Sequence, residues 1–163
     1  ATGFEVGTDY SRRAGIELLG CGDRTLTRAW ADGVRTLHGI QVHGFPNCFL
    51  MNNAQAGFTA NYPHLLDEQA KHIAYIVGAA AKRGCTRVEV TAQGESDWVQ
   101  RCLDKARDSG DFLENCTPGY YNNEGRVGER SAQDGFYGGG SIDYFRILGQ
   151  WRAQGALQGL ELR

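Results

Sequence analysis

Residues 44–84 decide the fold of this chain and read GFPNCFLMNNAQAGFTANYPHLLDEQAKHIAYIVGAAAKRG. The apolar run at 48–51 predicts a strand buried on both faces. Residues 52–61 are rich in Asn, Ala and Gly, which predicts a loop whose backbone lies close to a neighbouring group. Pro63, followed by apolar residues at helical spacing, predicts a helix that ends before Gly84. The inward face expected for this helix carries Leu66, Ala70, Ile73 and Val77.

Patterns outside this stretch predict two more helices and further strands. Residues 35–43 indicate one extended segment or a hairpin arm, Val88 and Val90 a half-exposed strand, and residues 160–162 an edge strand. Ser96 and Ser141 are expected to cap two helices, the second of which ends at Gly155. The inward side chains expected for these two helices are Val99, Leu103 and Ala106, and Ile142, Phe145 and Leu148. The fold class is therefore α/β, with a few strands and three helices.

Length and composition indicate one globular domain. The chain has 163 residues, of which 41% are hydrophobic and 22% charged, enough for a single core. Its net charge of −2 argues against a nucleic-acid partner. No apolar run approaches the roughly 18 residues of a membrane span, and no signal peptide opens the chain. A cytoplasmic protein without a membrane or nucleic-acid partner is expected.

Most familiar catalytic and metal-binding motifs are missing from the sequence. The five cysteines lack any CxxC spacing and are interpreted as reduced thiols; they are Cys21, Cys48, Cys85, Cys102 and Cys116. Two histidines four residues apart would suggest zinc on a helix, but His64 and His72 are eight apart, so no metal site is expected. Residues 138–140 are three glycines that predict a tight turn rather than a dinucleotide-binding loop. Asp67 and Glu68 suit a first helical turn on electrostatic grounds alone.

Three motifs along the chain resemble one known enzyme family. They are ATGF at residues 1–4, GFPNCF at 44–49 preceded by Trp30, Gly33, Thr36 and Gly39, and the glycines 138–140 followed by Tyr144, Phe145 and Arg146. In this order and spacing they resemble the C-terminal segment of flavin-dependent Baeyer–Villiger monooxygenases. The resemblance covers the whole chain but only about the last third of such an enzyme. Where members of the family commonly have Gly-Pro, this chain has Asn52-Asn53.

The resemblance implies an activity for the whole enzyme, and it implies that this chain is a fragment of that enzyme. Members use FAD and NADPH to insert one atom of O2 beside the carbonyl of a small ketone, which gives an ester or lactone. Residues 1–163 would be one partial domain, the C-terminal part of the FAD-binding domain in a flavoprotein with two dinucleotide-binding domains. The nucleotide-binding glycines and the catalytic arginine of the family would lie in a missing N-terminal part. The chain alone is expected to be inactive and to contain no catalytic residue.

The resemblance also implies a site at the loop and helix start. It places one stretch against the pyrimidine edge of the flavin and beside the substrate, namely Phe58, Thr59, Ala60, Asn61 and Tyr62. Free backbone N–H groups and a helix dipole would stabilise the negative charge of reduced flavin there. The alternative is that Asn61 only caps the helix and Phe58 only fills the core.

A second part of the site is expected in residues 115–140. This stretch has no regular period and is expected to be a mobile loop that closes over substrate. Tyr120 and Phe136, together with Phe58, are the expected substrate-binding residues. Two other functions stay open: a related flavin monooxygenase that oxidises nitrogen or sulfur, and a non-catalytic stand-alone binding domain. An exposed apolar patch would count against the stand-alone domain.

Overall fold

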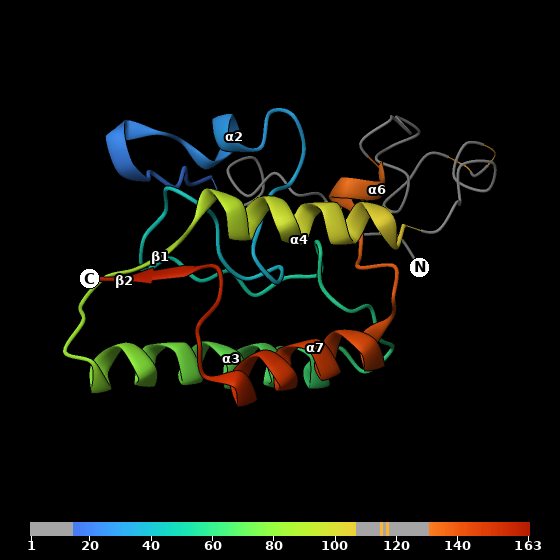
Figure 1. Cartoon of the computed structure of the whole chain (residues 1–163). Helices are drawn as coiled ribbons and strands as arrows, with labels where there is room; N and C mark the ends of the chain where they lie inside the picture. The colour runs from blue at the N-terminus through green and yellow to red at the C-terminus, as the bar shows by residue number, and fades with distance from the viewer. Residues whose placement is uncertain (1–14, 107–114, 116, 118–130) are drawn as a thin grey trace.

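The computed structural model describes residues 15–106, 115, 117 and 131–163. Three long helices, two short strands and three short helical turns make up this part of the chain (Figure 1). In chain order they are η1 (Cys21–Asp23), α2 (Leu26–Ala29), α3 (Tyr62–Lys82), β1 (Val88–Val90), α4 (Ala92–Asp104), α6 (Ser131–Asp134), α7 (Ser141–Gln154) and β2 (Leu160–Leu162). This mixture of helices and strands agrees with the expected α/β class.

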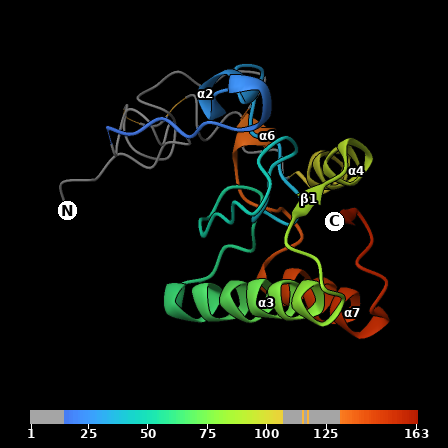
Figure 2. The ribbon, with the colours of Figure 1, turned by 90° about the vertical axis from the view of Figure 1, so that its left-hand side faces the viewer.

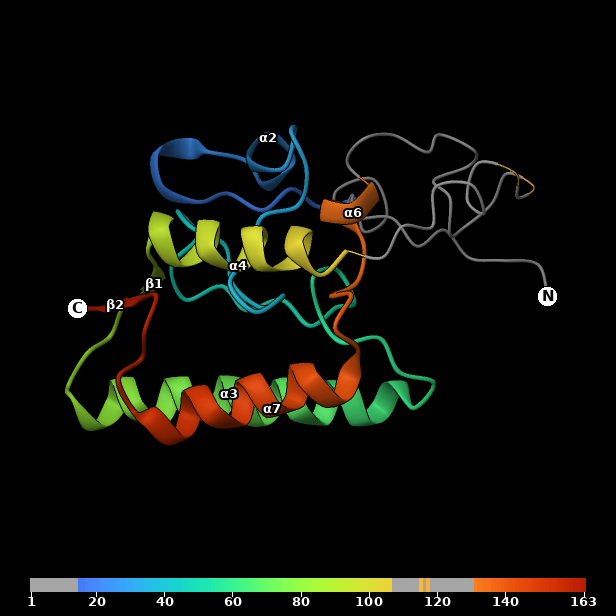
Figure 3. The same cartoon turned by 45° about the vertical axis from the view of Figure 1, so that its right-hand side comes forward.

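The helices form two layers with irregular chain between them. α3 and α7 lie side by side and run in the same direction in one layer, and α4 lies on the opposite side of the molecule (Figures 1 and 3). The strands β1 and β2 and much of the chain between α2 and α3 fill the space between these layers (Figure 2). The start of α3 and the start of α7 therefore lie at the same end of the molecule.

The bounds predicted for α3 are confirmed. The Asn61 side chain accepts a hydrogen bond from the His64 backbone N–H at 3.3 Å, so Asn61 caps the helix as the alternative interpretation expected. Gly84, just after the helix, has a φ of +67°. The predicted inward face is wrong by about one position, because Val77 is 50% exposed. α7 packs against the neighbouring face, which buries Leu65, Gln69, His72, Ile76 and Ala80.

The strand predicted at 48–51 is wrong. These residues form no strand, and a hydrogen bond of 2.6 Å from the Leu50 N–H to the Ile40 carbonyl is an isolated link. Leu50 is buried but Met51 is 43% exposed. An apolar run becomes a buried strand only where neighbouring strands bond it along its length, and the described residues place no such strand beside it.

The predicted helix after Val90 forms, but with a different cap and face. Thr91, not Ser96, is the cap of α4, because its hydroxyl accepts the Gly94 N–H at 3.0 Å. Val99 is buried as expected, whereas Leu103 is 38% exposed and Ala106 is also exposed. The earlier start turns a different side inward, and the side chains buried on it are Glu95, Trp98, Val99 and Cys102.

The predicted end of α7 at Gly155, with a φ of +69°, is confirmed. Its cap position is Gly140 instead of Ser141, which is the first helical residue. Leu148 is fully buried as expected, but Ile142 is 85% exposed and Phe145 is half-buried. Ile142 was misplaced because Tyr144, Ile147 and Trp151 define the inward face together with Leu148.

The predicted strands and the glycine turn are confirmed, whereas residues 35–43 contain a turn at 38–40 instead of forming one extended segment or one hairpin arm. β1 pairs with β2 in an antiparallel register that sets Val88 opposite Leu162. Residues 35–43 form a hairpin in which Leu37 and Gln41 make a bridge and His38 and Gly39 both have positive φ. The glycines 138–140 form a turn, and a Cβ atom on Gly138 would overlap the Lys105 carbonyl.

Some sequence predictions fall on residues that the structure does not describe. They concern residues 1–4, Tyr120, Cys116 and most of the loop predicted at 115–140. The other four cysteines are free thiols. Within the described ranges, no helix is long and apolar enough to cross a membrane, and no cluster of three or more His, Cys, Asp or Glu side chains could hold a metal ion.

Candidate functional site

The loop of residues 52–61 carries the predicted site residues to the start of α3. Phe58 is 52% exposed and Tyr62 is 40% exposed, so neither side chain fills the core. The Thr59 hydroxyl accepts the Asn61 backbone N–H at 3.2 Å, which holds the turn into the helix. Within the described part of the chain, the backbone N–H groups of residues 58–60 have no hydrogen-bond partner. These donors precede a helix of 21 residues, whose dipole adds positive potential at this end.

The structure brings two predicted substrate-binding residues together from distant parts of the sequence. The rings of Phe58 and Phe136 have centroids 4.5 Å apart and planes tilted by 36°. Phe136 comes from the segment between α6 and α7. The Tyr137 N–H donates to the Ala56 carbonyl at 2.9 Å, so the two segments are also bonded through their backbones. Phe58 and Phe136 form a partly exposed aromatic pair beside the free N–H groups of the loop.

The start of α7 packs against this loop. A Cβ atom on Gly57 would come within 2.9 Å of both the Ser141 Cα and the Tyr144 side chain. Gly57 therefore allows the loop to lie directly on α7. Next to it, the Tyr137 hydroxyl donates to Asp143 at 2.7 Å, and this hydrogen bond is the main reason that the pKa of Asp143 is lowered.

The prediction that Asp67 and Glu68 lie in the first turn of the helix is wrong, because α3 begins at Tyr62 and both residues follow its first turn. Lys71 lies 2.7 Å from Asp67 and 2.9 Å from Glu68, and Arg152 of α7 lies 3.4 Å from Glu68. The hydrogen bond from Lys71 is the largest cause of the lowered pKa of Glu68. A carboxylate with a lowered pKa stays ionised, so Glu68 is not suited to donate a proton near neutral pH.

Sequence analysis missed a buried histidine pair, because its members lie far apart in the chain. His38 of the hairpin and His72 of α3 are 5% and 1% exposed, and His38 Nδ1 lies 3.3 Å from His72 Nε2. The rings of Trp98 and Trp151 contact His38 with centroids 4.9 and 5.5 Å away. Burial, with a smaller effect of His72 and Arg101, lowers the pKa of His38 well below its usual value.

The pKa of His72 is lowered to about 3, mainly by burial and further by Arg152. Both imidazoles are therefore neutral near pH 7, and one ring donates to the other. Within the described part of the chain, no hydrogen bond or ring contact joins the histidine pair to Phe58 or Phe136. The histidine pair belongs to the core between the two helical layers, so its protonation affects the stability of the fold.

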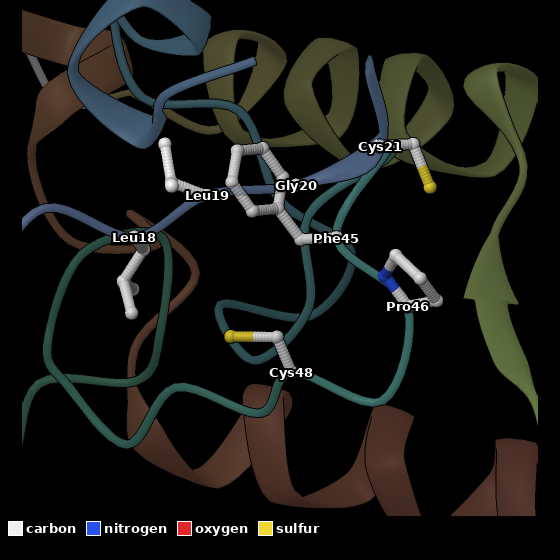
Figure 4. Close-up of a pocket in the computed structure, with 7 residues that line it drawn as sticks. All are labelled: Leu18, Leu19, Gly20, Cys21, Phe45, Pro46 and Cys48. Carbon is white, nitrogen blue, oxygen red and sulfur yellow. The ribbon is translucent and has the colours of Figure 1, made fainter. Parts of the chain in front are cut away.

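One surface hollow of the described residues lies away from the predicted site. It has a volume of about 270 Å³ and is lined by apolar side chains and two thiols (Figure 4). Its lining residues are Leu18, Leu19, Gly20, Cys21, Phe45, Pro46 and Cys48. None of the predicted site residues contributes to it, so we assign the candidate site from the loop and the aromatic pair instead.

The candidate site suits one end of a flavin. An aromatic pair and free N–H groups beside a helix start can meet a flat ring and the negative charge that collects at its edge. A pyrophosphate needs a glycine-rich turn between a strand and a helix, and the sequence has no GxGxxG motif. The residues present therefore fit the ring and leave the phosphates without a binding loop.

Curated proteins match the chain over all or nearly all of its residues. It is 48% identical over 100% of its residues to pentalenolactone D synthase of Streptomyces arenae, of which it covers 28%. It is 38% identical over 98% of its residues to the FAD-binding monooxygenase hmp7 of Hypomyces subiculosus, covering 27% of that protein. It is 37% identical over 99% of its residues to the Baeyer-Villiger monooxygenase ATR8 of Stachybotrys chlorohalonatus, covering 26%. No family model matches the chain.

The chain also superposes on part of solved monooxygenase structures. The polycyclic ketone monooxygenase of Thermothelomyces thermophila superposes with a TM-score of 0.83 at 31% identity, over 94% of this chain and 25% of that one. A steroid monooxygenase bound to NADP superposes with a TM-score of 0.74 at 27% identity, over 92% of this chain and 27% of that one. The chain spans about a quarter of the length of the curated relatives it matches.

Proposed function

We propose, from the premise that the chain belongs to the flavin-dependent Baeyer–Villiger monooxygenases as their C-terminal segment, that residues 58–62 border the flavin and the substrate. The protein that contains this segment would use FAD, NADPH and O2 to convert a ketone into an ester or lactone. The observation that carries the proposal is the Phe58–Phe136 pair beside the free N–H groups at the start of α3. Bound FAD would supply the redox chemistry.

The chain's own residues would have two tasks. The N–H groups of residues 58–60 and the α3 dipole would stabilise negative charge at the flavin edge. Phe58 and Phe136 would contact the apolar part of the ketone and keep water from the reaction centre. The mobile loop predicted at 115–140 does not hold for its described end, because residues 131–134 form α6 and residues 135 and 137 are bonded to Gln55 and Ala56. Tyr120 is proposed as a further substrate contact and lies outside the described residues.

Exposed apolar side chains do not by themselves decide against the alternative of a stand-alone binding domain. Large apolar residues are at least half exposed at five of the described positions, namely Ile16, Leu19, Phe58, Val77 and Ile142. Single exposed apolar side chains are common on soluble domains, and only a contiguous patch would mark a surface that the rest of a monooxygenase covers. Oxidation of nitrogen or sulfur remains a second enzyme function, but the three relatives above are not named for it.

The isolated chain is expected to bind FAD no tighter than tens of micromolar. The ring-binding residues are present, but no helix start with a glycine-rich turn is available for the pyrophosphate. Titration of the purified chain into FAD, followed by flavin fluorescence, measures this affinity. Saturable sub-micromolar binding would show that the chain holds the whole cofactor and would refute the assignment of a partial site.

Replacing Asn61 with Asp in the full-length flavoprotein tests the position of the loop. Asp caps a helix as well as Asn does, so α3 is expected to stay folded. A new negative charge beside the reduced flavin would make reduction harder and lower the midpoint potential by roughly 30 mV or more, equivalent to about 1.4 kcal/mol. Potentiometric titration of the bound flavin gives the value.

Asn61→Ser is the matched control, because it keeps a capping oxygen and adds no charge. Its potential should equal that of the parent. If Asn61→Asp also left the potential unchanged while the flavin remained bound, residues 58–62 would not border the flavin ring.

A further inference from the structure

Gln55 lies at the base of the candidate site in an unusual position. It is fully buried, and its φ of +55° is rare for a residue with a side chain. Such a conformation persists only where surrounding contacts over-determine it. A fully buried carboxamide also needs partners for its two donors and its acceptor oxygen. Gln55 satisfies both requirements through bonds to three separate segments.

The side chain of Gln55 makes four hydrogen bonds. Its Oε1 accepts from the Thr36 N–H at 3.1 Å and from the Thr36 hydroxyl at 2.7 Å. Its Nε2 donates to the Val34 carbonyl at 2.8 Å and to the Gln133 carbonyl at 3.0 Å. One side chain thus joins residues 34–36 to residue 133, which is about a hundred positions further along the chain.

The backbone of Gln55 is bonded on both sides as well. Its N–H donates to the Gly135 carbonyl at 2.7 Å, and its carbonyl accepts the indole N–H of Trp98 at 3.1 Å. Ala56 then accepts the Tyr137 N–H, as described above. The bonds to residues 135 and 137 lie directly on either side of Phe136, and Gln55 itself lies three residues before Phe58.

We propose that Gln55 is a positioning residue that sets the spacing and orientation of the Phe58–Phe136 pair. It does so by fixing both segments that carry these rings to one rigid support, the hairpin residues 34–36 and α4. The proposal rests on the proposed function only for its consequence, namely that Gln55 determines the width of the aromatic wall that meets the ketone. Gln55 itself touches neither the expected flavin nor the substrate.

Fluorine NMR of the chain labelled with 4-fluorophenylalanine tests the proposal without any cofactor. Each label reports the packing of its ring, and the signals are assigned by single Phe→Leu changes. Gln55→Met keeps the length of the side chain and removes all four of its hydrogen bonds. The signals of residues 58 and 136 are expected to move together, whereas that of Phe45, which is 4% exposed in a different core cluster, should stay in place.

Three further variants separate positioning from general destabilisation. Thr36→Val removes a single side-chain bond to Gln55, so it should move the same two signals by less, and it serves if Gln55→Met does not fold. Gln100→Met changes an exposed glutamine on α4 and should move neither signal. Asn61→Ser lies on the same loop but outside this network and should leave the pair in place.

Two outcomes would overturn the proposal. The first is that the signals of residues 58 and 136 keep their positions in a folded Gln55→Met variant. The second is that the Phe45 signal moves equally, which would mean that Gln55 supports the fold as a whole. Neither outcome depends on flavin binding, so the proposed function could fail while this inference held, or the reverse.

Discussion

Acidification from pH 7 to pH 5 is expected to lower the free energy of unfolding of this chain by about 2 kcal/mol through His72, and further through His38. Both imidazoles are buried and have pKa values below the ordinary 6.5, with His72 at about 3. In the unfolded chain both would protonate as the pH falls through about 6.5. The unfolded state then binds more protons than the folded state, so stability decreases as the pH falls.

The magnitude of this loss follows from the pH range over which a histidine is protonated in the unfolded chain but neutral in the folded one. Each histidine contributes about 1.4 kcal/mol per pH unit once the pH lies below the unfolded value and above the folded one. Over the interval from pH 7 to pH 5 this amounts to about 2 kcal/mol for His72, and His38 adds to the loss in the same direction. Since a domain is stable by only about 5–15 kcal/mol, the effect is a large share of the total. Glu68 and Asp143 have lowered pKa values and add their loss only at more acidic pH.

Urea unfolding followed by circular dichroism at pH 7, 6 and 5 measures this dependence. His72→Gln removes one titrating ring and keeps a donor and an acceptor, so the loss of stability between pH 7 and 5 should become smaller by about 2 kcal/mol. His64→Gln is the matched control on the same helix, because His64 is exposed, and it should keep the full dependence. An unchanged dependence in His72→Gln would exclude the histidine pair as its cause.

The sequence predicted those features of the fold that depend on local signals. The start of α3 at Pro63, its end before Gly84 and the end of α7 at Gly155 were all predicted, because caps and terminal glycines act within a few residues. The antiparallel partner of Val88 and Val90 was not predicted, although both strands were. Local chemistry defines where an element begins and ends, but it does not define what packs on it.

The errors in the helix faces share one cause. On α3, α4 and α7, the predicted faces followed aliphatic spacing, whereas the buried faces include His72, Glu95 and Tyr144, which a hydrophobic pattern passes over. These polar side chains are buried because distant residues bond them; the Tyr144 hydroxyl, for example, donates to the His38 carbonyl at 2.8 Å. A pattern within one helix carries no information about such partners.

The residues of the candidate site also fall into those that the sequence indicated and those that only the structure reveals. Phe58 was named from the resemblance and Phe136 from the aromatic composition of residues 115–140, and the structure brings them together. Gln55 was not, since a single glutamine in a loop rich in Asn and Ala has no distinguishing spacing. Its role is visible only once Val34, Thr36 and Gln133 are seen around it.

Trp98→Ala is expected to cost about 3–5 kcal/mol of stability, the range found when a large buried aromatic side chain is removed. Trp98 is 3% exposed on α4, and its ring lies against His38, Tyr137 and Tyr144 with centroids 4.9, 5.4 and 6.2 Å away. The substitution would leave a cavity that these rings cannot fill without leaving their own contacts. It would also leave the buried Gln55 carbonyl without the indole N–H.

Two further variants separate these contributions. Trp98→Phe keeps an aromatic ring but loses the N–H, so it should cost about 1–3 kcal/mol. Ile142→Ala removes an apolar side chain that the sequence placed inside and the structure leaves 85% exposed, and it should change stability by less than about 0.5 kcal/mol. Urea unfolding at pH 7 measures all three. If Ile142→Ala proved as costly as Trp98→Ala was expected to be, the inward face of α7 would follow the aliphatic pattern after all. If Trp98→Ala cost no more than the small change expected for Ile142→Ala, the packing of Trp98 between the helical layers would be wrong.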